Sequence, residues 1–118
     1  MSLNIRMQDN IAIVKISDKL LSDYQREGIL SPIEEKIDVG ISLFILDLSE
    51  LKLINSSGLG ILITILTKAR KAGGEAILTG INEQISKLLV ITKLTAVFTT
   101  TKTIEEGINY LKNTLINA

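Results

Sequence analysis

The chain has 118 residues, of which 46% are hydrophobic and 22% charged, with 13 basic and 13 acidic side chains and no His, Cys or Trp. This length predicts one domain, which we assign to residues 1–118. The lack of His and Cys excludes thiolate and imidazole metal sites, disulfides and Ser-His or Cys-His nucleophiles. The formal net charge of zero removes the broad positive field that nonspecific nucleic-acid binding requires.

The chain also lacks the signals of secretion and membrane insertion. Its N-terminal segment has no apolar core of the signal-peptide type, and no run approaches the ~20 apolar residues that a membrane span requires. We therefore expect a cytoplasmic protein without a membrane span, and we expect it not to bind nucleic acid.

The first predicted element is a β-hairpin. Residues 11–17 form a short, apolar and largely β-branched run, which indicates a strand, and a weaker strand precedes it over 3–7. Asp9 and Asn10 between them are typical turn residues. We therefore expect the two strands to pair as a hairpin.

An interrupted helix follows. Apolar residues approximate helical spacing from 20 to 39, but Gly28 and Pro32 break the pattern. Ser31 is placed to cap a helix, Pro32 suits the first helical position, and Glu34 can close a capping box. We therefore expect a broken or kinked helix with a fresh helical segment at Ser31.

The rest of the chain alternates strands with helices. Residues 41–49 are apolar on both faces, which is typical of a central strand in a parallel sheet. The later elements are a turn at 50–52, a helix capped by Asn55 or Ser56 that ends at Gly73-Gly74, a strand at 75–80, a helix capped by Asn82, a strand at 95–100 and a helix capped by Thr103. This order predicts an α/β fold with a mixed, mostly parallel sheet of about five strands and about four helices.

The segment that leads into the helix after residue 55 carries the clearest functional signal. Ser56 and Ser57 stand at the helix start, where unpaired amides and about half a positive charge tolerate a phosphate group. On local pattern alone, however, Asn-Ser-Ser before an apolar helix is usually just an N-cap. The spacing of Gly58 and Gly60 provides neither the third Gly nor the Lys-Ser/Thr of a phosphate-binding loop, which excludes a nucleotide cradle.

The same predicted helix has a wide apolar surface. Its apolar residues cover an arc of roughly 200°, whereas a one-sided surface helix needs about 100°. Either a neighbouring helix covers the excess, or Ile61 or Ile63 helps to form a partner-binding patch. The sequence leaves both explanations open.

These features together resemble the STAS domain family, and specifically its bacterial anti-sigma factor antagonists. The similarity runs over nearly the whole chain. The matching residues are Asp47-Leu48-Ser49 at the end of a strand, Asn55-Ser56-Ser57-Gly58-Leu59-Gly60 at the start of a helix, and the basic stretch from Lys68 to Gly74. The resemblance implies a single STAS domain with a STAS-like α/β fold, and a protein with no catalysis, cofactor or metal of its own.

The resemblance also implies a partner switch. In the family, the unmodified antagonist binds an anti-sigma factor that is also a serine kinase. The kinase phosphorylates the first Ser of the motif and so breaks the complex, and a serine phosphatase resets it. Carried over by position, the phosphoacceptor is Ser56. We expect the partner-binding residues to be Asn55, Ser56, Ser57, Gly58, Leu59, Gly60, Ile61 and Ile63.

Two positions depart from the family pattern. Asn55 stands where the family usually has Asp before the acceptor Ser, and Leu21 stands where an Asp commonly follows the second strand, with Asp23 close but out of register. These departures motivate an alternative, namely an unphosphorylated STAS scaffold or subunit of a signalling or lipid-transport assembly. A third hypothesis is a sensor that holds an anionic ligand at the Ser56 helix start. The sequence leaves open whether the protein is a monomer or a homodimer.

Overall fold

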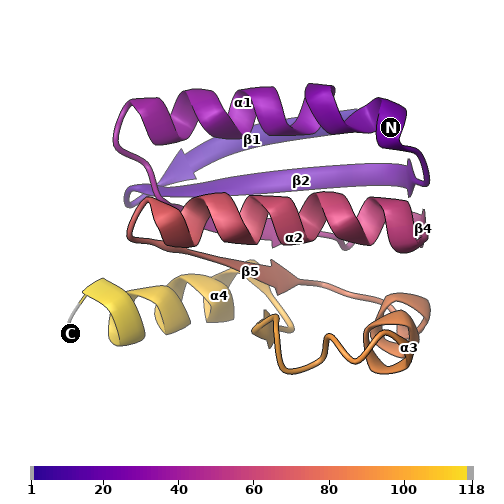
Figure 1. The fold of residues 1–118 in the computed structure, drawn as a ribbon. Helices are drawn as coiled ribbons and strands as arrows, with labels where there is room; N and C mark the ends of the chain where they lie inside the picture. Colours follow the sequence, from indigo (N-terminus) through magenta and orange to yellow (C-terminus); the bar gives the residue numbers. More distant parts are fainter. Residues whose placement is uncertain (1, 117–118) are drawn as a thin grey trace.

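The computed structural model describes residues 2–116 as a mixed β-sheet with helices on both faces (Figure 1). In chain order the elements are β1 (Ser2–Gln8), β2 (Ile11–Leu20), a 3₁₀ turn (Asp23–Gln25), α1 (Arg26–Asp38), β3 (Leu43–Asp47), β4 (Leu51–Ile54), α2 (Ser56–Lys71), β5 (Glu75–Thr79), α3 (Glu83–Ile91), β6 (Thr100–Thr101), α4 (Ile104–Leu111) and a π-helical turn (Lys112–Ile116).

The sheet is parallel except at one edge. Within residues 2–116 it has six strands, in the order β1-β2-β3-β5-β6, with β4 paired to β2 off this path. The β1–β2 pair is antiparallel and the other pairs are parallel. The predicted α/β class with a mixed, mostly parallel sheet is therefore confirmed. The predicted hairpin is also present, and Asp9 and Asn10 form its turn with φ of 55° and 66°, the positive values that type I′ turns require.

Two strands differ from the sequence prediction. Residues 51–54, part of which we expected as a turn, form β4. They do so because β2 runs on beyond its last pair with β3, and its final residues offer backbone groups for pairing. At the other edge, β6 is much shorter than the predicted strand 95–100. The residues before it close a turn, in which the Val97 N–H donates to the Leu94 carbonyl at 3.0 Å.

The predicted break at Pro32 is absent, because α1 is one continuous helix. Ile29 and Ile33 lie on either side of Pro32 and both are fully buried. Packing against the core therefore holds the helix together where local propensity opposes it. The chain changes direction earlier, at the 3₁₀ turn, where Ser22 and Gln25 form a capping box.

The sheet separates two cores. Successive residues of a strand point to opposite faces, so Phe44 of β3 packs with residues of α1 and α2, whereas Ile45 packs with Ile108 and Leu111 of α4. Figure 1 shows α1 and α2 side by side over the first of these faces. None of the helices within residues 2–116 is both long and apolar enough to cross a membrane.

The topology sets the start of α2 beside the end of β2. β4 pairs with the last residues of β2 and continues through Asn55 into α2. The Asn55 N–H itself donates to the Leu20 carbonyl at 3.4 Å. The connection from β2 to α1, which includes the 3₁₀ turn, therefore lies next to the first turns of α2 (Figure 1).

Candidate functional site

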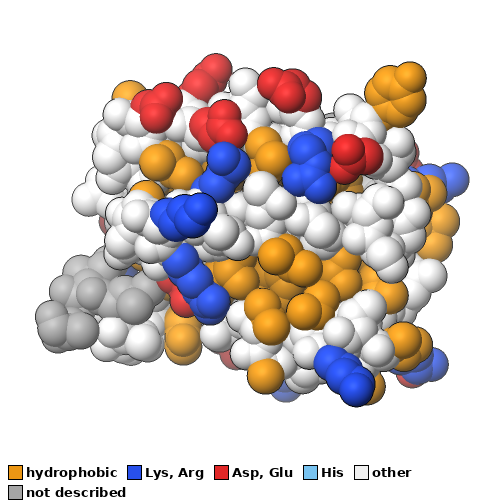
Figure 2. Space-filling view, in the orientation of Figure 1, with side chains coloured by type: hydrophobic (Ala, Val, Ile, Leu, Met, Phe, Trp, Pro, Cys, Tyr) orange, Lys and Arg blue, Asp and Glu red, His pale blue; other side chains and the backbone are white. Residues whose placement is uncertain are grey.

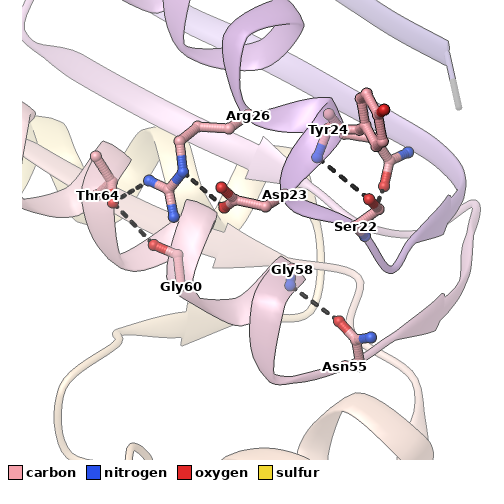
Figure 3. A network of polar contacts seen from close by, with 9 residues as sticks. Ser22, Asp23, Tyr24, Arg26, Asn55, Gly58, Gly60 and Thr64 are labelled. Atoms are coloured by element: carbon pink, nitrogen blue, oxygen red, sulfur yellow. Dashed lines mark hydrogen bonds and ion pairs between the residues drawn. The ribbon is translucent and has the colours of Figure 1, made fainter.

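Asn55 ties the first turn of α2 to the end of β2. Its Oδ1 accepts a hydrogen bond from the Gly58 N–H at 3.0 Å (Figure 3), and its Nδ2 donates to the Leu21 carbonyl at 2.9 Å. An Asp could accept the first bond, but an ionised carboxylate has no hydrogen for the second. The Asn that departs from the family pattern therefore has a structural role in this chain, as the N-cap of α2 and as a link to β2.

Gly58 lets α2 approach β2 closely. A Cβ at this position would lie 2.2 Å from the Leu20 carbonyl oxygen and 2.9 Å from Cγ1 of Ile54. Leu59 and Ile61, which we also expected at the partner surface, are 2% and 0% exposed. The excess apolar arc is thus covered at Ile61, which belongs to the core that α1 and α2 share. These residues support the site from beneath and are not accessible to a partner.

Ser56 and Ser57 are the first two residues of α2, and both are exposed. Within the described part of the chain, neither hydroxyl has a hydrogen-bond partner. The first backbone bond of the helix runs from the Leu59 N–H to the Asn55 carbonyl at 2.9 Å. The N–H groups of Ser56 and Ser57 therefore lack intrahelical partners, and α2 has no acidic residue in its first turn to offset the positive end of its dipole.

The remaining predicted residues, Gly60 and Ile63, lie on the solvent side of α2 and are partly exposed. They share this side with the two serines and with Thr64 and Thr67, as the 100° step of an α-helix requires. We call this side the outer face of α2. It is defined by Ser56, Ser57, Gly60, Ile63, Thr64 and Thr67.

Sequence reasoning missed an Arg that reaches the outer face of α2 from α1. The Arg26 Nε pairs with Oδ1 of Asp23 at 2.9 Å, and its Nη1 donates to the Thr64 hydroxyl at 3.1 Å (Figure 3). The i, i+3 spacing of Asp23 and Arg26 was visible in the sequence. The contact with Thr64, 38 residues away, was not.

Exposed apolar side chains border the start of α2. On the side of β2, the 3₁₀ turn and β4, the side chains of Leu21, Tyr24 and Leu53 are 39%, 97% and 36% exposed. On the side of α3, Ile91 is 77% exposed and lines a shallow groove together with Ile54. Figure 2 shows a further group of apolar side chains between α2 and the connection from α3 to β6. No sequence period joins these residues, because they belong to separate elements.

A model of the STAS domain family matches residues 2–107. The chain belongs to the STAS domain family. The match covers every element that forms the site and most of the described chain. The resemblance that the motif residues suggested is thus confirmed.

Solved structures with the same fold include anti-sigma factor antagonists. A Thermotoga maritima protein assigned to that class is 22% identical, over 93% of this chain and 94% of its own, with a TM-score of 0.85. The Bacillus cell fate determinant SpoIIAA in its phosphorylated form is 20% identical, over 92% and 97%, with a TM-score of 0.71. RsbS of Moorella thermoacetica, in a serine-to-glutamate variant, is 24% identical, over 96% and 97%, with a TM-score of 0.74.

The Asp47-Leu48-Ser49 motif of this STAS domain forms the turn after β3. Asp47 is 7% exposed, and its Oδ1 accepts a hydrogen bond from the Ser49 N–H at 3.0 Å. Nearby, the hydrogen bond and charge of Glu50 raise the pKa of Lys15, with a smaller contribution from Asp47. These contacts stabilise the strand ends, and among residues 2–116 no acidic cluster is arranged to hold a metal ion.

Proposed function

We propose that this STAS protein is an anti-sigma factor antagonist that binds an anti-sigma factor with serine kinase activity and is switched off by phosphorylation of Ser56. The observation that carries the proposal is the Ser56 hydroxyl, which is exposed and unbonded within the described residues at the positive end of α2. The anti-sigma factor antagonists among the proteins of the same fold support it.

The proposed modification needs nothing from this chain beyond a hydroxyl. The Ser56 Oγ takes the γ-phosphoryl group of ATP, ADP leaves, and the hydroxyl proton passes to a base of the kinase. A chain without His can serve as such a substrate because the partner supplies the nucleotide and the catalytic groups. We propose accordingly that the protein is not an enzyme, acts in the cytoplasm as a single STAS domain over residues 1–118, and is reset by a serine phosphatase.

The charge of the phosphate explains how one modification could end binding without unfolding the protein. Phosphorylation adds about 1.5 to 2 negative charges. The N-terminal end of α2 tolerates them, because its free N–H groups and dipole favour an anion. A partner packed against the apolar border of Leu21, Tyr24 and Leu53 would instead bury the phosphate in a drier environment, which is costly.

The proposed partner surface centres on the exposed part of the motif. It comprises Asn55, Ser56 and Ser57 with Gly60 and Ile63 of the outer face, and it extends to the apolar side chains that border them. Among these bordering residues Tyr24 is of the type most enriched in binding hot spots, where Trp, Tyr and Arg predominate.

Incubation with the cognate kinase and ATP tests the switch. Mass spectrometry is expected to map one phosphate to Ser56, and the modified protein is expected to leave the complex. Ser56→Ala should abolish labelling, whereas Ser57→Ala is the matched control and should keep it. Labelling at Ser57, or none at Ser56, would contradict the switch. Co-purification of a transporter ATPase or of other STAS chains, without a kinase-like partner, would favour the unphosphorylated scaffold instead.

A further inference from the structure

Arg26, the first residue of α1, lies over the outer face of α2 (Figure 3). Its Nε is 2.9 Å from Oδ1 of Asp23, and its Nη1 is 3.1 Å from the Thr64 hydroxyl. Thr64 donates in turn to the Gly60 carbonyl at 2.9 Å. These bonds hold the guanidinium on the same side of α2 as Ser56 and one to two turns further along.

The guanidinium keeps donors to spare. It carries five N–H groups, and within the described part of the chain only those on Nε and Nη1 have acceptors. Nη2 is the atom that faces residue 60, at 3.9 Å from where a Cβ would lie. Because Gly60 has no side chain, this part of the guanidinium stays open over the helix surface.

A phosphate on Ser56 comes within reach of this guanidinium. Residues four apart on an α-helix are surface neighbours, with Cβ atoms about 5–6 Å apart, and Ser56 and Gly60 have this spacing. The Arg26 side chain is 38% exposed, so part of it is open to solvent, and rotation about its own bonds can carry the guanidinium toward residue 56. The two groups can therefore meet without a backbone movement.

The charges favour an exchange of partners. The Asp23 side chain is 73% exposed, and an exposed ion pair of this kind adds little stability. A phosphate carries up to twice the charge of a carboxylate and accepts two parallel hydrogen bonds from one guanidinium. The interaction free energy that Arg26 gains with the phosphate is thus larger than the one it loses with Asp23.

We propose that Arg26 is the charge partner of a phosphate on Ser56: after phosphorylation its guanidinium leaves Asp23 and pairs with the phosphate oxygens. This inference rests on the proposed function, because it takes Ser56 as the modified residue. The exchange also frees the 3₁₀ turn that carries Asp23 and Tyr24 from its link to α2. Phosphorylation then changes the border of the partner surface as well as its centre.

The test uses the full chain with phosphoserine incorporated at position 56 during translation, so that no kinase is needed. Phosphorus NMR at about 0.15 M KCl measures the second pKa of the phosphate, which is about 6 in an unperturbed phosphoserine. A paired guanidinium favours the dianion, so Arg26→Gln is expected to raise this pKa by about half a unit. Asp23→Asn removes a competing negative charge and is expected to lower it.

Arg70→Gln is the matched control, because it removes the same charge from the far end of α2. Arg70 lies 14 residues, or about 21 Å along the helix axis, from Ser56, which is beyond the screening length of about 8 Å. Its replacement should therefore leave the second pKa of the phosphate unchanged. Arg26→Lys keeps the charge without the planar fork, so it is expected to give an intermediate pKa. This variant takes the place of Arg26→Gln if the latter does not fold.

Equal pKa values with and without Arg26, or equal shifts in Arg26→Gln and Arg70→Gln, would overturn the proposal. Failure of the kinase to modify Ser56 would instead contradict the proposed function and leave this measurement intact.

Discussion

The two ends of α2 are built for different tasks. At the C-terminal end, Lys68 pairs with Glu34 at 2.9 Å and Arg70 with Glu75 at 3.0 Å, so two of the three basic side chains that suit the helix dipole also have partners. At the N-terminal end, the exposed hydroxyls of Ser56 and Ser57 have none within the described residues. The end whose charges are paired serves the fold, and the end that is left open is the one at which we propose modification.

The largest expected effect concerns the packing beneath the open end. Gly58→Ala would push a methyl group to 2.2 Å from the Leu20 carbonyl oxygen, and should lower the free energy of unfolding by about 3 kcal/mol. Urea denaturation measures this loss of unfolding free energy. Gly60→Ala is the matched control, because its nearest atom is the movable Arg26 Nη2 at 3.9 Å and helix propensity favours Ala. Similar losses in both variants would refute the steric explanation.

The next effect concerns binding at the open end. Ser56→Asp should weaken the proposed complex with an anti-sigma factor by about 100-fold, because it brings an anion into a surface that desolvates on binding. Thr67→Asp adds the same charge to the outer face of α2 three turns later, and should weaken binding far less. Titration calorimetry with the purified partner checks both. Equal affinities for the two variants would show that the partner surface is not centred on the start of α2.

A smaller effect concerns the cap itself. Asn55→Ala removes both side-chain bonds and should cost about 1–2 kcal/mol of unfolding free energy. Asn55→Asp keeps the cap but loses the donor to the Leu21 carbonyl, so its cost should be about 1 kcal/mol or less. Thermal unfolding compares the two. If the Asn55→Asp variant proved as stable as the native protein, the link to β2 would be worth no more than the charge–dipole interaction that Asp gains at the helix start.

The smallest effect concerns the C-terminal end of α2. Lys68→Gln removes one largely exposed ion pair and should change the free energy of unfolding by no more than about 0.5 kcal/mol. Chemical denaturation at low and high salt checks this, since salt should reduce even that difference. A loss of more than about 1 kcal/mol would show that the two ends contribute to stability more equally than we infer.

Local signals were sufficient for much of the fold. Asn82 and Thr103 cap α3 and α4 as predicted, accepting hydrogen bonds at 2.9 and 3.1 Å from backbone N–H groups three residues on. Where the prediction failed, the cause is tertiary. The pairing that creates β4 depends on how far β2 extends, and α1 continues through Pro32 because the core buries residues on both sides of it.

The sequence indicated the centre of the candidate site but not its border. The motif indicated Ser56 because the signal is contiguous, and Ser56 is indeed exposed at a helix start. A helical period gives the spacing of Ile61 and Ile63 but not the position of α1, so it could not tell which of the two is covered. Arg26 and Tyr24 reach the site through folding of the β2–α1 connection, which no local pattern encodes.

The exposure of Tyr24 gives the protein an optical reporter of its own. The chain has no Trp and only two Tyr, and the other, Tyr110, packs against the core beneath α4 on the opposite face of the sheet. Tyr24 is 97% exposed on the turn whose link to α2 runs through Asp23 and Arg26. Changes in intrinsic tyrosine emission on adding a partner without Trp or Tyr can therefore be followed without a label and assigned to one side of the molecule.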